Sequence, residues 1–218
     1  MLTSSTIDDM RLRRVRWLMY DRARGGFRFR GSRAPDRRQA RESVMDAEVP
    51  LGSTPEELVE NFTVSETRYP AYAALQGLGD DALAAIHDGL GHGNWQVRKW
   101  CAMYLDHHTN DESFVLLKPL LRDPKMDVRL WATHSISCER CKEGECPVDF
   151  VPLLIERIEM DESIRVRRMA VCMLSEAPPD KRALSTLQRI VAEEEDRKLL
   201  GHVGRELQRF RDAGLMTT

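Results

Sequence analysis

A short pattern recurs in register along the last three quarters of the chain and constrains its fold more than any other feature. Residues 94–105, 126–136 and 165–174 each contain Val-Arg, a large side chain two positions later and an apolar residue seven positions after the arginine. Two weaker copies flank them, so the five register arginines are Arg68, Arg98, Arg129, Arg167 and Arg197. Their spacings are 30, 31, 38 and 30 residues. Self-similarity at this period indicates a stacked array of short repeats.

Each copy of the pattern predicts a pair of helices. An apolar segment with helical spacing precedes every register arginine, so each unit is a helix A, a short turn and a helix B. In the first unit Ser53 or Thr54 is a candidate cap and Pro55 suits the first helical turn. The spacing predicts helix A over about 55–63, and helix B from Arg68 to about 77–79. One pair cannot bury its apolar face alone, whereas five stacked pairs bury a continuous core.

The motif Asp/Asn-x-x-Val-Arg-x-x-Ala/Cys-x-x-x-Leu resembles the HEAT repeat, in the short bacterial form of phycobilisome-lyase-like HEAT proteins, over about residues 53–212. The resemblance implies an all-α, right-handed, armadillo-like α-solenoid of about five stacked helix pairs, and a scaffold or adaptor function. We therefore divide the chain into an Arg-rich N-terminal helix or arm with an acidic linker, residues 1–52, and a HEAT-repeat solenoid, residues 53–218.

One side of helix B carries unusual side chains. Counted from the register arginine, positions −1, +3 and +7 form an apolar stripe against helix A, while +2 and +5 lie on the opposite side. In the HEAT family that side lines the concave surface. Large apolar residues there indicate a binding surface, and the predicted partner-binding residues are Trp100, Trp131, Met103, Met169 and His202. Both tryptophans could instead fill gaps between repeats, and we expect the register arginines to pair with acids or carbonyls of neighbouring repeats.

The one long spacing reflects an insertion that is rich in cysteine. Cys138, Cys141 and Cys146 lie within nine residues, and Cys-x-x-Cys forms a knuckle that brings two sulfurs to one metal. His134 precedes Cys138 by one helical turn. These four residues predict a closed, structural zinc site. His107 or His108, at the end of the preceding helix B, could replace His134. Free thiols, a disulfide or redox pair and an iron–sulfur cluster are the alternatives.

The N-terminal segment has the strongest charge asymmetry. Residues 11–41 contain twelve arginines against Asp21 and Asp36, whereas residues 42–66 contain seven acids and no base. Arginine interleaved with aromatic residues suits phosphate neutralisation and base stacking. The candidate contacts to nucleic acid or an acidic partner are Arg11, Arg13, Arg14, Arg28 and Arg30. A folded-back cap over the first repeat and simple disorder are the alternatives.

The sequence contains no nucleophile elbow, phosphate loop or His-Glu-x-x-His, so we predict a protein that is not an enzyme. A HEAT-like alkylpurine DNA glycosylase uses concave tryptophans and an aspartate, but Tyr104 and Ser135 stand one turn after Trp100 and Trp131. A bilin lyase activity is implied only by the resemblance. Because no apolar run spans a bilayer and no apolar leader follows the start, we expect a cytoplasmic protein without a membrane partner. The leading hypothesis is a non-catalytic scaffold that grips a protein or peptide on its concave helix-B face.

Overall fold

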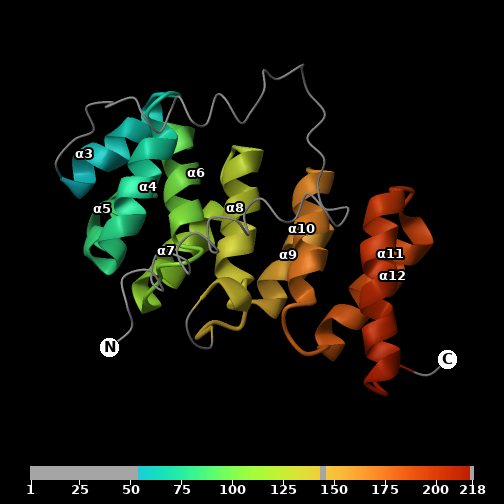
Figure 1. Cartoon of the computed structure of the whole chain (residues 1–218). Coiled ribbons are helices and arrows are strands. Elements are labelled where there is room, and N and C mark those ends of the chain that lie inside the picture. The colour runs from blue at the N-terminus through green and yellow to red at the C-terminus, as the bar shows by residue number, and fades with distance from the viewer. Residues whose placement is uncertain (1–53, 143–145, 217–218) are drawn as a thin grey trace, which may run out of the picture. The chain divides into compact units, whose positions relative to one another are not determined.

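The computed structural model describes residues 54–142 and 146–216, which fold into an all-helical solenoid of five consecutive helix pairs (Figure 1). The A helices are α3 (Pro55–Glu60), α5 (Leu83–Gly89), α7 (Asp111–Leu120), α9 (Val151–Met160) and α11 (Leu184–Glu193). The B helices are α4 (Arg68–Leu78), α6 (Trp95–Tyr104), α8 (Met126–Ser137), α10 (Ile164–Leu174) and α12 (Arg197–Asp212). Short 3-10 turns occupy Asn61–Thr63, Gly79–Ala82, Glu139–Cys141 and Lys181–Ala183. The predicted all-α solenoid is therefore confirmed.

Several predictions concern residues 1–52, namely the basic helix or arm, the acidic linker and the five arginines proposed to contact nucleic acid. All of them lie outside the described residues. None of the helices that the structure describes is both long and apolar enough to cross a bilayer.

Local sequence explains where the helices begin. The Thr54 hydroxyl accepts a hydrogen bond from the Glu57 amide, the Glu57 carboxylate accepts one from the Thr54 amide, and Pro55 starts α3. Asn94 caps α6 by accepting from the Gln96 amide at 2.9 Å. These contacts satisfy amides that a helix leaves without partners in its first turn.

The B helices form the closer-packed row of the solenoid. α6, α8, α10 and α12 pack on one another in chain order (Figure 1), and α7, α9 and α11 pack mainly on their own B helices. The first pairs differ, because α3 contacts α5 as extensively as it contacts α4, whereas α4 contacts α6 little. The predicted apolar stripe is confirmed in the three best copies by burial of Val97, Cys101, Leu105, Val128, Ala132, Ile136, Val166, Ala170 and Leu174.

Buried arginine–aspartate pairs join successive repeats. Arg98 donates two hydrogen bonds to Asp123, through Nε at 2.6 Å and Nη2 at 3.0 Å. One repeat further on, Arg129 donates in the same way to Asp161 at 2.8 and 3.0 Å, and also to the carbonyl of Asp123 at 2.9 Å. Each aspartate lies in the turn before the next helix B, and a carboxylate oxygen also accepts from a backbone amide there. The predicted pairing between repeats is confirmed for both arginines.

The remaining register positions depart from this pattern. In the fourth repeat the equivalent aspartate, Asp196, is bound by Arg168, while Arg167 donates to the Ile158 carbonyl at 3.0 Å and lies 2.7 Å from Glu194. In the first repeat Arg68 binds carbonyls of its own repeat, and in the last repeat Arg197 is exposed.

Candidate functional site

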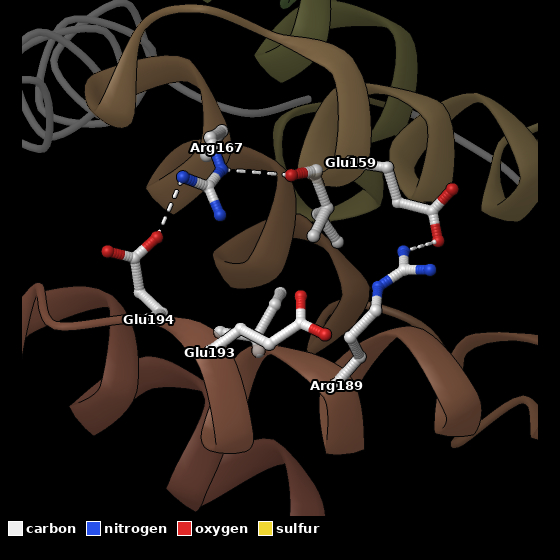
Figure 2. A pocket seen from close by; sticks show the side chains of 7 residues that line it. Glu159, Arg167, Arg189, Glu193 and Glu194 are labelled. Atoms are coloured by element: carbon white, nitrogen blue, oxygen red, sulfur yellow. Dashed lines mark hydrogen bonds and ion pairs between the residues drawn. The ribbon is translucent and has the colours of Figure 1, made fainter.

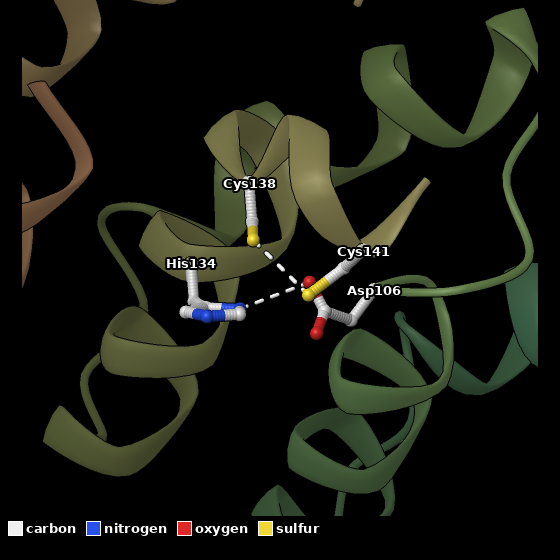
Figure 3. Close-up of side chains that lie close together, drawn as sticks. All are labelled: Asp106, His134, Cys138 and Cys141. Atoms are coloured by element: carbon white, nitrogen blue, oxygen red, sulfur yellow. Dashed lines mark hydrogen bonds and ion pairs between the residues drawn. The ribbon is translucent and has the colours of Figure 1, made fainter. Parts of the chain in front are cut away.

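Four side chains with metal-binding atoms converge at one end of α6 and α8 (Figure 3). Asp106 lies in the turn after α6, and His134 lies in the last turn of α8. Cys138 is the C-cap of α8, and Cys141 ends the 3-10 turn that follows. One nitrogen, oxygen or sulfur atom from each lies within 4.8 Å of the others. Asp106 is only 2% exposed and Cys138 only 3%, so the cluster is largely shielded from water.

The contacts within the cluster are close. The Sγ atoms of Cys138 and Cys141 are 3.0 Å apart, and His134 Nδ1 lies 2.9 Å from Asp106 Oδ1. The Cys138 amide donates to the His134 carbonyl at 2.9 Å, so the helical backbone carries Cys138 to the same side as His134. The Lys142 amide donates to Glu139 at 3.1 Å and closes the turn that brings Cys141 back.

A second layer of side chains holds the cluster in place. His107 Nδ1 donates to the Cys141 carbonyl at 3.1 Å, and its Nε2 lies 3.8 Å from Asp106 Oδ2. Lys142 Nζ donates to the Cys138 carbonyl at 3.0 Å. The ring of Trp131 meets the His134 ring edge-on, with centroids 5.7 Å apart. Both carboxylate oxygens of Asp106 therefore face an imidazole.

The surrounding charges favour the anionic forms of Asp106 and Cys138 and the protonated form of His134. Burial alone would raise the pKa of Asp106, but His134 and Lys142 hold that pKa below its usual range. Burial disfavours the charged form of His134, yet the Asp106 carboxylate raises the pKa of His134 to about 10. The contact with Cys141 lowers the pKa of Cys138, and the same contact together with burial raises the pKa of Cys141. Cys138 is therefore the first of the two thiols to ionise, and a bound cation would take the place of the proton on His134.

The structure brings together three of the four predicted metal ligands and differs at the fourth. Cys146 is not part of the cluster, and its Sγ lies 3.4 Å from the Ile136 carbonyl and 3.7 Å from the Val148 carbonyl. The side chain instead packs beside apolar residues. The fourth position belongs to Asp106, which sequence analysis missed because it lies 28 residues before His134 and reaches the site only through the stacking of repeats.

The two tryptophans of the predicted partner-binding face are half-buried. Trp100 stacks on Phe62, with ring centroids 5.6 Å apart, and lies 5.4 Å from the ring of Tyr72. Trp131 packs against the same apolar cluster while keeping part of its surface exposed. Each tryptophan thus packs between helices and also keeps part of its surface exposed.

Other members of that predicted face divide into two kinds. Met103 is only 8% exposed and belongs to the core, so including it in a binding surface is a prediction that the structure corrects. Met169 and His202 are half-buried, and His202 Nδ1 lies 3.0 Å from Cys172 Sγ of the preceding helix B.

A depression of about 200 Å³ between α9, α10 and α11 is lined by charged side chains (Figure 2). Its cations and anions already satisfy one another, because Arg167 pairs with Glu194 and Arg189 pairs with Glu159. The volume is also below the usual 300–1,000 Å³ or so of a small-molecule site. This depression is therefore a weaker candidate for ligand binding than the Asp106–Cys141 cluster.

Comparison with known proteins agrees with the fold. A family model described as HEAT repeats matches residues 57–137, which lie within α3 to α8. A crystal structure of an engineered protein shares 16% sequence identity and a TM-score of 0.46 with this chain, over 72% of this chain and 79% of that one. No curated protein matches the sequence. The helix pairs, the register arginines and the family match agree that the chain contains HEAT repeats, matched over residues 57–137.

Proposed function

We propose that this HEAT-repeat scaffold binds a protein segment along one side of its B helices. The surface concerned is the helix-B stripe, defined as Trp95, Lys99, Trp100, Trp131 and Met169. All five side chains are half-buried, on three successive B helices. Solenoids use extended surfaces of this kind to hold partners. The observation that carries the proposal is this run of large, partly exposed apolar side chains at equivalent positions of neighbouring repeats.

The position of the stripe suits an extended ligand. We place the ligand along the B helices because α6, α8 and α10 pack on one another in chain order and so offer a continuous surface. A segment that crosses α6, α8 and α10 would meet Trp100, Trp131 and Met169 in turn. Apolar residues that are exposed on the A helices, such as Val115 at 64% and Val191 at 53%, stand singly and need no such explanation.

Lys99 gives the stripe a chemical preference. Its Nζ lies 5.7 Å from the ring centroid of Trp95 and 5.3 Å from that of Trp100. Burial lowers the pKa of Lys99, which means that the charged ammonium has lost part of its hydration. A carboxylate from a partner would restore that lost stabilisation. We therefore expect the ligand to be an extended segment that combines apolar side chains with an acidic residue.

Selection from a random peptide library on the immobilised full chain tests this function. We expect enriched peptides to contain apolar and acidic residues, and their affinity to fall at least tenfold in Trp131→Ala and in Lys99→Ala. Val115→Ala, on the opposite helix row, is the matched control and should bind as the wild type does. Peptides that bind Trp131→Ala and Lys99→Ala with unchanged affinity would refute the proposal. Loss of the helical circular dichroism signal in Trp131→Ala would assign that residue to the core.

A further inference from the structure

We propose that Asp106, His134, Cys138 and Cys141 together bind one zinc ion. None of the four ligands belongs to the helix-B stripe, although Trp131 of that stripe contacts His134. The ion would fasten the cysteine-rich insertion after α8 to the turn after α6. Local helix and turn geometry brings His134, Cys138 and Cys141 together, and the stacking of repeats adds Asp106.

The donor set points to zinc rather than to a hard cation. Two sulfurs, one imidazole nitrogen and one carboxylate oxygen make a mixed soft and borderline site. Magnesium and calcium prefer oxygen ligands only, and iron–sulfur clusters usually take four thiolates. Four protein ligands complete a tetrahedron and leave no position for a substrate, which is the arrangement of a structural site. The thiol protons of Cys138 and Cys141 would pass to solvent on binding.

The distances between the ligand atoms require only small side-chain shifts to accommodate a tetrahedral zinc ion. A tetrahedral ion with Zn–S bonds near 2.3 Å separates two sulfurs by about 3.7 Å, and shorter Zn–N and Zn–O bonds give an edge of about 3.3 Å. The Sγ atoms of Cys138 and Cys141 are 3.0 Å apart, and His134 and Asp106 meet at 2.9 Å. The largest separation in the cluster is at most 4.8 Å. These values lie on both sides of the tetrahedral edges, so side-chain shifts of less than about 1.5 Å suffice.

The surrounding contacts resemble those that orient metal ligands. Zinc-bound carboxylates and imidazoles are usually held by outer hydrogen bonds. His107 approaches the second oxygen of Asp106 and holds the Cys141 carbonyl, while Trp131 packs edge-on against His134. Lys142 lies close to the anionic ligands and offsets their negative charge.

The location explains what a bound ion would stabilise. The buried core falls into two clusters, one running from Leu58 to Ile136 and the other from Cys138 to Phe210. The break between them coincides with the insertion. Asp106 follows a helix of the first cluster, whereas Cys138 belongs to the second and Cys141 packs against it. Zinc at this point would therefore fasten the two halves of the solenoid to each other.

Metal analysis of the purified, reduced full chain tests the proposal. After incubation with zinc and removal of loosely bound ions, we expect about one zinc per chain in the wild type and in Cys146→Ser. We expect Asp106→Asn and Cys141→Ser to weaken zinc binding, measured by competition with a chromophoric chelator, by more than about 100-fold. The helical circular dichroism signal of each variant shows that it is folded. Cobalt substitution supplies a second readout, because the thiolate charge-transfer band should indicate two sulfurs in both the wild type and Cys146→Ser.

Three results would overturn the proposal. One is a reduced wild-type chain that retains no zinc. Another is retention of zinc by Asp106→Asn with loss in Cys146→Ser, which would establish the ligand set expected from sequence spacing instead. The third is a Cys138–Cys141 disulfide that resists mild reductant and keeps the thiols from metal. If a variant fails to fold, the comparison of cobalt spectra between the wild type and Cys146→Ser still decides between two and three thiolates.

Discussion

The ion pair between Arg129 and Asp161 allows a quantitative test of how neighbouring repeats are joined. The Asp161 side chain is 1% exposed and that of Arg129 is 7% exposed. A second buried arginine, Arg157, lies 3.6 Å from the same carboxylate. Asp161→Asn retains the shape of the side chain and an oxygen that can accept from the Ser163 amide, but it removes the negative charge between two cations.

The expected loss of stability follows from burial. Breaking a buried pair by neutralising one partner costs about 3–5 kcal/mol, because the other charge stays in a poorly solvated place. For a chain of this size each kcal/mol shifts the thermal midpoint by about 2–4 °C, so Asp161→Asn should melt about 6–20 °C lower. Asp161→Ala also removes the contact with Ser163 at 2.8 Å, which adds about 0.5–2 kcal/mol.

The measurement is the thermal midpoint of unfolding, followed by circular dichroism near pH 7. Asp149→Asn provides the control, because the Asp149–Arg182 pair joins neighbouring repeats in the same way but is half-exposed. Exposed pairs contribute only about 0–1 kcal/mol. Equal shifts in Asp161→Asn and Asp149→Asn would refute the view that burial sets the strength of these links. A double variant with Arg129→Met should recover part of the loss, since it removes one of the stranded charges.

Two further predictions concern the Arg168–Asp196 ion pair and the close contact at Gly89. The bond from Arg168 lowers the pKa of Asp196, so this pair stabilises the fold fully above about pH 4 and loses its effect as pH falls through the folded-state pKa. Melting curves should show that Asp196→Asn is destabilised at pH 7 and that its difference from the wild type shrinks steadily as the pH is lowered below about 4. Gly89→Ala would place a methyl group 2.5 Å from Cys101 Sγ, so we expect denaturant titration to show a loss of about 1–3 kcal/mol, whereas Gly93→Ala, which has open space, should show none.

The fold could be predicted from the sequence because its signals are local and repeated. A register of about 30 residues fixed the five helix pairs, and positions −1, +3 and +7 identified buried residues such as Val97 and Leu174. Helix starts followed from short-range chemistry, as at Thr54 and Pro55. Where one copy of the pattern is degenerate, as at Arg197, its register follows from the other copies. Repetition therefore supplied the evidence that an alignment of relatives would otherwise give.

The details of the candidate sites were harder to predict, because they depend on how one repeat faces the next. Cys146 lies in the right stretch of sequence to join Cys138, but its side chain turns toward apolar neighbours. Met103 lies on the nominally outer side of its helix, yet its side chain is buried. Helical periodicity describes one helix in isolation, and it cannot state how wide the buried arc becomes when helices stack on both sides.

Several of the contacts described above join residues that lie about one repeat apart in the sequence. Asp106 meets His134 across 28 residues, Cys172 meets His202 across 30, and Arg129 meets Asp161 across 32. In a solenoid each unit touches only its neighbours, so side chains that act together must come from one unit or from two adjacent ones. A polar or sulfur-bearing residue should therefore be compared with residues about 30 positions away before it is grouped with its neighbours in sequence. Applied to His134, this comparison reaches the turn that holds Asp106, and it explains why sequence spacing within the insertion alone named the wrong fourth member of the cluster seen in the structure.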